Sequence, residues 1–490
     1  MGEPRGDRLV RAAPLGLLAL ALAWITTKAA ARIDDPDDWW HLRLGNDLIH
    51  QHSLSAPHHW STFADQSWVP TEPLPEIVSA LVDRWLGLPG LAWLFGLFLI
   101  LVTVSLYVVN RQRAAALPAV VVTVLAFVPM YGALSSRPQL VSFVLIPVLL
   151  GAWFRSEEDL RPRWWLVPLC WFWSLCHGFW FIGVAYGFAG VVAVIVRRRA
   201  TTRQVASLAG VAVASLAVVL LNPIGLGVLQ APFAVNGGAK YITEWQHPHP
   251  LTPEPLGAWL MIALTLLVWG ITRRGVTTYG VLLLLSAVFW AWYAERTVIV
   301  SALVSAPVLA GALDALLRPA RADDRADDRA DDRADGQADA LSRPGRPGRP
   351  ERLVIGVAAA LSLVGLAIAV PHTSRLPGSV PLALDARLDR EPPGSPVLND
   401  YALGGWIAWR HPDLNQYIDG LATPYSPRHD EDFHTIENQG PGWYRLVEQS
   451  GAQLALVESD TTLRQALERR GWRDDGSDAG YVLLVTPIYN

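Results

Sequence analysis

Apolar segments alternate with polar connections along most of this chain. A helix needs about 20 mainly apolar residues to cross a bilayer, and the longer segments reach that length. The pattern therefore predicts an α-helical polytopic membrane protein with about eleven transmembrane helices. The predicted spans are residues 13–31, 91–110, 117–134, 138–154, 164–177, 179–196, 204–221, 255–272, 277–293, 297–317 and 353–371.

Arginine residues mark one end of most predicted spans. Basic residues are in excess on the cytoplasmic side of membrane proteins, which places the N-terminus inside and the C-terminus outside. The stretch 164–196 fits least well, because two short spans must make a full return. Span 164–177 is short for a full crossing, so the turn 176–178 is expected below the outer surface, in a cavity. The marker arginines are Arg5, Arg8, Arg11, Arg111, Arg113, Arg155, Arg161, Arg163, Arg197, Arg198, Arg199, Arg273, Arg274, Arg318 and Arg321.

The first apolar run, from Pro14 to Ala30, could also belong to a signal peptide. We favour an uncleaved first span, since further spans follow it and the acidic cluster 34–38 is a poor flank for cleavage.

The predicted spans belong to a transmembrane module, residues 1–317, and to a last transmembrane helix, residues 353–371. Two regions outside the spans differ from ordinary connections. The first outer loop, 32–90, is too long for a connector, and residues 41–49 predict an amphipathic helix on the membrane surface. Residues 318–352 repeat Arg-Ala-Asp-Asp and then Arg-Pro-Gly. That composition cannot form a core, so we predict a disordered cytoplasmic linker.

Residues 372–490 alternate short apolar runs with segments of helical character. This order predicts a small extracytoplasmic α/β domain with a largely parallel sheet. The predicted strands lie at 397–398, 417–418, 452–457 and 481–485, and the predicted helices at 404–409, 443–449 and 461–470.

Composition agrees with a membrane protein. The 490 residues are 51% hydrophobic and only 17% charged, against about 25% charged in soluble domains. The net charge of −4 gives no reason to expect a nucleic-acid partner. Many of the 22 tryptophans lie at span ends, as in interfacial belts. The two cysteines, Cys170 and Cys176, favour neither a structural disulfide nor a metal site.

Nearly every unusual polar cluster falls on the predicted outer side. The first is the acidic cluster 34–38, followed by Trp39-Trp40-His41. Carboxylates at such a place can act as general bases or hold a divalent cation. The alternative is a solvated turn that caps a helix beginning near Trp39, where aspartate is favourable in its own right. The convergence of further motifs on the same side favours the functional interpretation.

Those further motifs carry phosphate-binding and sugar-stacking side chains. Arg137 and Arg296 could clamp a phosphate, although arginines at span ends also extend to lipid headgroups. His177 could act as a phosphate donor, a base or a metal ligand, or be a satisfied buried histidine. The run Glu244-Trp245-Gln246 supplies a tryptophan platform suited to sugars. In the C-terminal domain, Asn399-Asp400 and Asp419-Gly420 follow strands, where either ligand binding or turn chemistry explains them.

In their order, these motifs resemble a poorly characterised branch of the bacterial GT-C glycosyltransferase superfamily. The resemblance covers most of the chain outside 318–352. It rests on Asp35-Pro36-Asp37-x-Trp39-Trp40-His41-Leu42 with Gly45, Trp68 with Glu72, Arg137-Pro138-Gln139, His177-Gly178, Asn222-Pro223-x-Gly225, Glu244-Trp245-Gln246, Arg296, Asn399-Asp400-Tyr401 with Gly404-Gly405, and Asp419-Gly420 with Tyr425. The sequence departs from the branch at Leu421, where arginine is common, and at His59-Trp60, where an aspartate is common.

The resemblance implies a bacterial plasma-membrane enzyme that transfers a sugar from a polyprenyl-phosphate carrier to an extracytoplasmic glycan, lipid or protein. The first outer loop of such enzymes supplies the catalytic aspartate, here Asp37 with Asp35 as second choice. No cofactor is certain, but Asp35 and Asp37 could hold Mg²⁺ or Mn²⁺. The residues expected to bind substrate are Arg137, His177, Glu244, Trp245, Gln246, Arg296, His41 and Glu72.

Two other classes of function remain open. A lipid or polysaccharide transporter or flippase should show inverted repeats and ionisable residues at mid-membrane. No repeat is visible, and the ionisable residues gather at the outer ends. A non-catalytic scaffold for cell-envelope assembly would need no carboxylate, so replacement of Asp37 separates it from an enzyme.

Overall fold

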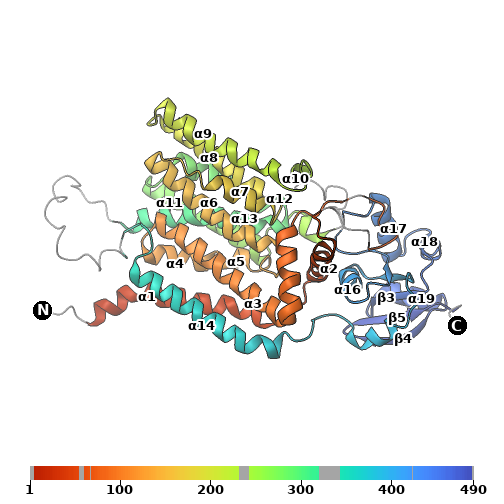
Figure 1. Ribbon diagram of the computed structural model, residues 1–490. Helices are drawn as coiled ribbons and strands as arrows, with labels where there is room; N and C mark the ends of the chain where they lie inside the picture. The colour runs from red at the N-terminus through yellow and green to blue at the C-terminus, as the bar shows by residue number, and fades with distance from the viewer. Residues whose placement is uncertain are drawn as a thin grey trace, which may run out of the picture.

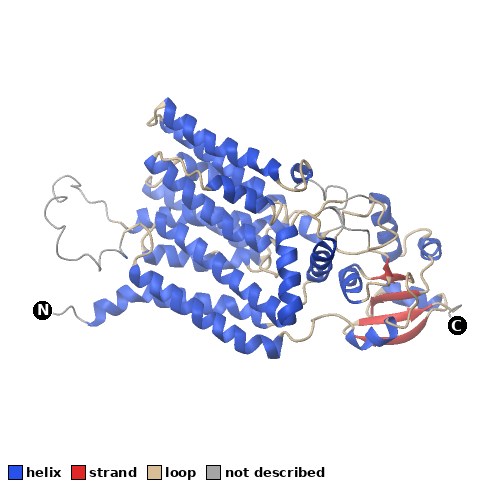
Figure 2. Ribbon diagram, viewed as in Figure 1, coloured by secondary structure: helices blue, strands red, loops and turns tan. Residues whose placement is uncertain are grey.

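The computed structural model describes residues 5–54, 60–66, 68–230, 242–318, 341, 343–421 and 423–487, without the side chains of 5–12 and of residue 230. His59 and most of the linker predicted for 318–352 lie outside the described residues. A helical bundle forms one part of the molecule, and a small domain of strands and short helices stands at one end of it (Figures 1 and 2).

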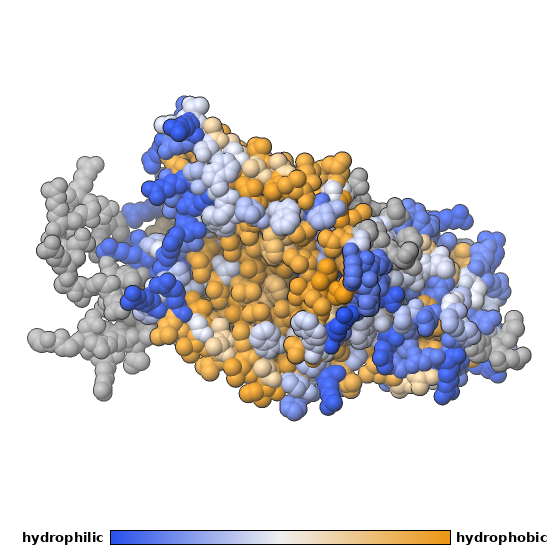
Figure 3. All heavy atoms as spheres, in the orientation of Figure 1, coloured by the Kyte–Doolittle hydropathy of each residue, from blue (hydrophilic) through white to orange (hydrophobic). Residues whose placement is uncertain are grey.

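All eleven predicted spans coincide with helices. Among the described residues, eight helical segments are long and apolar enough to cross a membrane, two more are apolar but shorter, and α7 has only nine residues. On the face seen in Figure 3, the bundle presents an apolar band between two polar ends. The chain is a polytopic α-helical membrane protein. Its bundle helices are α1 Arg5–Thr26, α3 Pro73–Arg113, α4 Ala116–Leu125, α5 Phe127–Met130, α6 Gln139–Asp159, α7 Leu166–Ser174, α8 Trp180–Arg197, α9 Thr202–Ala217, α10 Gly227–Gln230, α11 Pro253–Thr272, α12 Thr278–Tyr293, α13 Val298–Leu317 and α14 Arg349–Thr373.

Helix ends rich in arginine meet at the end of the bundle away from the small domain. Arg113, at the end of α3, pairs with Glu158 near the end of α6 at 2.8 Å. Arg111 forms a fully buried ion pair of 2.7 Å with Glu351, in the first turn of α14. Residues 349–352, the end of the predicted disordered linker, are therefore helical and anchored to α3.

The second predicted span, 91–110, corresponds to the part of α3 that follows a kink at Gly87, whose φ is 66°. A further helical segment, from Pro73 to the kink, precedes this span and was not predicted. Proline is favoured in the first turn of a helix because its missing N–H has no intrahelical partner there. Pro73 and Pro75 accordingly stand at the start of this segment.

Helix α2 (Pro36–Gln51) packs against protein on two sides, and its position on the membrane surface remains a prediction. One face packs on the first part of α3, where a Cβ at Gly45 would lie 2.1 Å from the carbonyl oxygen of Glu76. Trp39 is 1% exposed and stacks on Trp409 of the small domain, with ring centroids 5.2 Å apart. The apolar face of α2 thus joins the bundle to the small domain.

The small domain contains a mixed five-stranded sheet in the order β2-β1-β3-β5-β4. β1 pairs with β2 and β3 in parallel, whereas β5 pairs with β3 and β4 antiparallel, so the prediction of a largely parallel sheet is only half right. Its strands are β1 Pro396–Asn399, β2 Asn415–Gln416, β3 Leu454–Glu458, β4 Arg473–Asp478 and β5 Tyr481–Val485. Its helices are α15 Asp385–Leu388, α16 Gly404–Arg410, α17 Pro427–Glu437, α18 Trp443–Ser450 and α19 Thr462–Arg469.

Most predicted elements of this domain lie where expected, and Thr461 caps α19 by accepting from the N–H of Arg464. The strand predicted at 417–418 lies at Asn415–Gln416 instead. α17 and β4 were not predicted. Polar residues dominate both elements, so neither shows an apolar repeat.

The contact between α2 and α3 predicts a stability effect. Gly45→Ala forces two backbones apart, and overpacking of this kind typically costs about 1–3 kcal/mol. Gly16→Ala, on an exposed face of α1 with no atom within 4 Å of the added carbon, is the matched control. We expect a lower midpoint of thermal unfolding in detergent for Gly45→Ala only. Equal midpoints would contradict the tight crossing.

The arginine-rich end predicts the topology. Reporter fusions after Arg199 and Arg274 should report the cytoplasm, and a fusion at Gly440 the opposite side. The same compartment for Arg199 and Gly440 would contradict this arrangement.

Candidate active site

A cavity of about 590 Å³ lies where the bundle meets the small domain. α2, the start of α3, the turns before α6 and α8, and two short 3-10 helices, η4 (Thr243–Trp245) and η5 (Glu295–Thr297), contribute to its wall. The small domain adds Tyr401 and the segment around Gly420. The cavity therefore belongs to no single part of the chain.

Arg137 contacts three carboxylates in this region. Its Nε lies 2.7 Å from Asp35 Oδ2, and its Nη1 lies 2.8 Å from Asp37 Oδ2 and 3.1 Å from Glu244 Oε2. Asp35 also caps α2, since its Oδ1 accepts from the N–H of Asp37 at 3.1 Å. The acidic cluster is thus a helix cap and a part of the site at once.

Glu244 connects the two arginines of the cavity. Its second oxygen, Oε1, lies 3.1 Å from Arg296 Nη1. The guanidinium of Arg296 also stacks on Trp245 at 4.6 Å, while its buried Nε finds no partner among the described residues. The N–H of Glu295 donates to the carbonyl of Gln246 at 3.0 Å, which holds η4 against η5.

His177 is held in one tautomer by its neighbours. Its Nδ1 accepts from the backbone N–H of Phe179 at 3.2 Å, so the ring proton of the neutral form is on Nε2. Nε2 points to Glu72 Oε1, 3.4 Å away. On the other side, Ser142 lies 3.0 Å from Nδ1 and accepts from Trp173 at 2.7 Å.

Burial governs the acidity of the cavity. It raises the pKa of Asp37 to about 6, with nearby Arg137 acting in the opposite direction. It likewise raises the pKa of Glu72 to about 8. Among the described lining residues, four carboxylates face two guanidinium groups. The excess of negative charge makes each added anion costly unless protons or cations compensate it.

Most of the predicted site residues come together here. Eight of them line the cavity, namely Asp37, Arg137, His177, Glu244, Trp245, Arg296, His41 and Glu72. Asp35 reaches the site through Arg137 and does not line the cavity itself. Gln246 is not among the lining residues and contributes its backbone carbonyl to the contact with η5. The roles assigned to these side chains remain predictions.

The sequence analysis gave no role to three residues that matter here. Glu76 lies one helical turn after Glu72, a spacing of four that puts both on one face and could have revealed it. Asp38 is buried and accepts a hydrogen bond from the hydroxyl of Ser136. Tyr401 reaches the cavity from the small domain, and no local sequence signal shows this.

The motifs of the small domain serve its folding. Asn399 donates to the carbonyl of Ile418 and accepts from the N–H of Tyr417, both at 2.8 Å. Asp419 accepts from the hydroxyl of Tyr425 at 2.9 Å. Gly420 has a different role, because a Cβ there would lie 2.6 Å from Asp37 Oδ1. Only a glycine lets this backbone approach the acidic cluster so closely.

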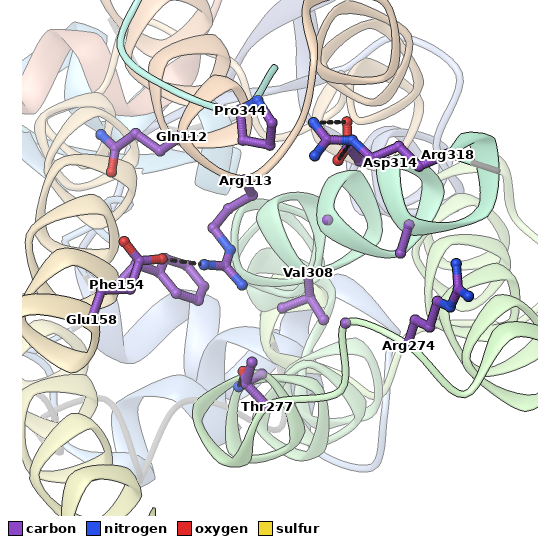
Figure 4. A pocket seen from close by; sticks show the side chains of 14 residues that line it. Gln112, Arg113, Phe154, Glu158, Arg274, Thr277, Val308, Asp314, Arg318 and Pro344 are labelled. Atoms are coloured by element: carbon purple, nitrogen blue, oxygen red, sulfur yellow. Dashed lines mark hydrogen bonds and ion pairs between the residues drawn. The ribbon is translucent and has the colours of Figure 1, made fainter. Parts of the chain in front are cut away.

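A second cavity, of about 400 Å³, opens at the arginine-rich end of the bundle (Figure 4). Two of its arginines are neutralised within it. Arg113 pairs with Glu158, and Arg318 with Asp314 at 2.9 Å. We attribute these pairs to packing between helix ends and assign no chemistry to the cavity.

In sequence comparisons, no protein-family profile and no curated protein matches this chain. Its fold is similar to that of solved structures. The oligosaccharyltransferase of Archaeoglobus fulgidus, tethered to an acceptor peptide, aligns with a TM-score of 0.55 at 15% identity, over 92% of this chain and 70% of that one. Apo ArnT from Cupriavidus metallidurans aligns with a TM-score of 0.50 at 15% identity, over 98% and 97%.

These likenesses extend over nearly the whole chain, both bundle and small domain. At such low identity they establish the fold, and they agree with the resemblance found in the motifs. The chain therefore has the fold of a polytopic membrane protein similar to these two solved structures.

Proposed function

We propose that this protein is a membrane glycosyltransferase that moves a sugar from a polyprenyl-phosphate donor to an extracytoplasmic acceptor, with inversion at the anomeric carbon. The observation that carries the proposal is the half-buried carboxylate of Asp37, held beside Arg137 in a cavity at the end of the membrane bundle. Such an arrangement supplies a base and an anion-binding group in one place.

Asp37 is the proposed general base. One displacement breaks the bond between the anomeric carbon and the phosphate oxygen, and forms a bond from that carbon to the acceptor oxygen. The acceptor hydroxyl loses its proton to Asp37, and the lipid phosphate leaves with the electron pair. A base works best when its pKa lies near the working pH, and burial moves the pKa of Asp37 toward that range.

Arg296, Arg137 and His177 are the proposed contacts of the departing phosphate. Arg296 suits this role because one of its buried nitrogens has no partner among the described residues. His177 presents an N–H into the same cavity, and charged donors are effective where negative charge develops. In this scheme a phosphate replaces Glu244 as the partner of the two arginines.

The structural neighbours support this class of donor. One structure of the Archaeoglobus fulgidus oligosaccharyltransferase AglB, in complex with an inhibitory peptide and a dolichol-phosphate, aligns with a TM-score of 0.55 at 14% identity. It covers 98% of this chain and 75% of the other. A polyprenyl phosphate is the corresponding ligand here, and Tyr401 with the segment around Gly420 would face the acceptor.

Asp37→Asn keeps the size of the side chain and removes the proton acceptor. We expect turnover to fall by about 10²- to 10⁴-fold while donor affinity stays within a few fold. Asp34→Asn, in the same acidic cluster but exposed and outside the cavity, is the control and should keep full turnover. The assay is sugar release from polyprenyl-phosphate donors by protein in nanodiscs. Full turnover in Asp37→Asn would remove this residue from the chemistry.

Arg296→Ala should act on the donor instead. Loss of a charged hydrogen bond typically costs about 1.5–3 kcal/mol, so the donor should bind about 10- to 100-fold more weakly. Affinity is measured by titration of a fluorescent polyprenyl phosphate. Unchanged affinity would contradict the assignment. Absence of both binding and turnover with every lipid-linked sugar would favour the scaffold.

The pKa of Asp37 also predicts a pH profile. Above pH 6 its carboxylate is deprotonated and can accept a proton, so turnover should be on its plateau near pH 8. Below pH 6 protonation removes the base, and turnover at pH 5 should be about tenfold below the plateau. The charged groups that contact or act on Asp37 are Arg137, Asp35 and Glu244. The residual turnover of Asp37→Asn should lack this limb, and a wild-type profile flat to pH 5 would contradict the assignment.

A further inference from the structure

Three side chains of metal-binding type that line the cavity meet one another. One potential ligand atom from each of His41, Glu72 and Glu76 lies within 4.8 Å of the other two. In one of these contacts His41 Nδ1 lies 3.1 Å from Glu76 Oε1. Ligand atoms around a tetrahedral zinc ion lie about 3.3–3.5 Å apart. Side-chain rotations that shorten the longer of the present separations would therefore bring the three atoms to that spacing.

Glu76 shows that this cluster is incomplete by itself. Its side chain is 2% exposed, yet Oε2 has no hydrogen-bond partner among the described residues. A buried carboxylate oxygen without a partner is costly. Because Glu76 lines the cavity, a ligand entering from there could satisfy it.

Asp37, Glu72, Glu76 and Glu244 line the cavity together with two arginines. A divalent cation bound to Glu72 and Glu76 would displace any protons on them, because carboxylate ligands bind a metal in the deprotonated form. Its charge would lie beside the lipid phosphate that the proposed function requires.

The Asp35 and Asp37 carboxylates, which the sequence suggested as metal ligands, are less suited to this task. Both already pair with the guanidinium of Arg137, at 2.7 and 2.8 Å. A metal bound between them would lie next to a fixed positive charge. Among the described residues, Glu72 and Glu76 form no ion pair with an arginine; Glu76 contacts His41, and Glu72 contacts His177 at 3.4 Å.

We propose that His41, Glu72 and Glu76 form a binding site for a divalent transition metal of the zinc class, open to the cavity. One imidazole and two carboxylates suit zinc better than magnesium, which prefers oxygen ligands and retains its waters. Three protein ligands leave a fourth position free, as in sites where a metal contacts substrate. The location rests on the geometry of the three side chains, and the role beside the phosphate rests on the proposed function.

The test is metal binding by the full-length protein, purified without a polyhistidine tag and stripped with a chelator. Zn²⁺ is titrated by calorimetry, and Co²⁺ is followed by its visible absorption, which reports low-coordinate nitrogen and oxygen ligands. We expect one tight site per chain. Glu76→Gln and Glu72→Gln should each weaken it by about 100-fold or more, since even groups that only orient a ligand are worth about 10- to 100-fold.

Three further outcomes decide the proposal. Asp65→Asn, at an exposed carboxylate outside the cavity, should bind Zn²⁺ as the wild type does. Loss of the site in Asp37→Asn, with full binding in both glutamine variants, would place the metal at the acidic cluster and overturn the assignment. Absence of any tight Zn²⁺ or Co²⁺ site in the folded wild type would also overturn it. Glu72 is the more exposed glutamate, so its variant stays informative if Glu76→Gln unfolds.

Binding is measured without donor or acceptor, so the two proposals can fail separately. Zn²⁺ binding without sugar transfer would support the proposed metal site and contradict the proposed function. Sugar transfer without a tight Zn²⁺ site would support the proposed function and contradict the metal site.

Discussion

The guanidinium of Arg137 holds the acidic cluster, the start of α6 and η4 in one place. It contacts three carboxylates from two separate segments of the chain, and each of these would otherwise repel the others in a buried cavity. Removing one partner of a buried ion network leaves an uncompensated charge, which is far more costly than the pair is stabilising. The positions of Asp37 and of Glu244 therefore depend on the same side chain, and so does any substrate that lies between them.

The fold was largely accessible from sequence, because a membrane imposes strong periodic constraints. Apolar runs of fixed length and asymmetric arginines mark helices without any knowledge of their partners. Errors arose where tertiary contacts decide the structure. The helical segment that begins at Pro73 was not predicted, and it is held by a crossing with α2 at Gly45. The antiparallel half of the sheet includes β4, whose polar residues carry no apolar repeat.

The sequence predicted which residues belong to the site better than it predicted which of them contact one another. Charged and aromatic residues at span ends are rare enough to be noticed, and most of those singled out line the cavity. Their pairing could not be predicted. The ion pair between Glu244 and Arg296 forms because a backbone hydrogen bond, from Glu295 to Gln246, holds two segments distant in sequence side by side. Glu76 was overlooked as a site residue, although its spacing from Glu72 is a local signal. Tyr401 depends on how the small domain sits against α2, which no local pattern encodes.

The glycines at the boundary of the small domain limit how this protein can be divided. Gly405 lies against the start of α2, where an added Cβ would be 3.0 Å from the carbonyl oxygen of Pro36, and Gly420 lies against Asp37. Trp39 is buried beneath Trp409. In three dimensions, α2 thus packs as a part of the C-terminal domain, although it lies some 350 residues earlier in the sequence. A chimaera that exchanges the C-terminal domain between related proteins would have to carry α2 with it, and the acidic cluster would travel along.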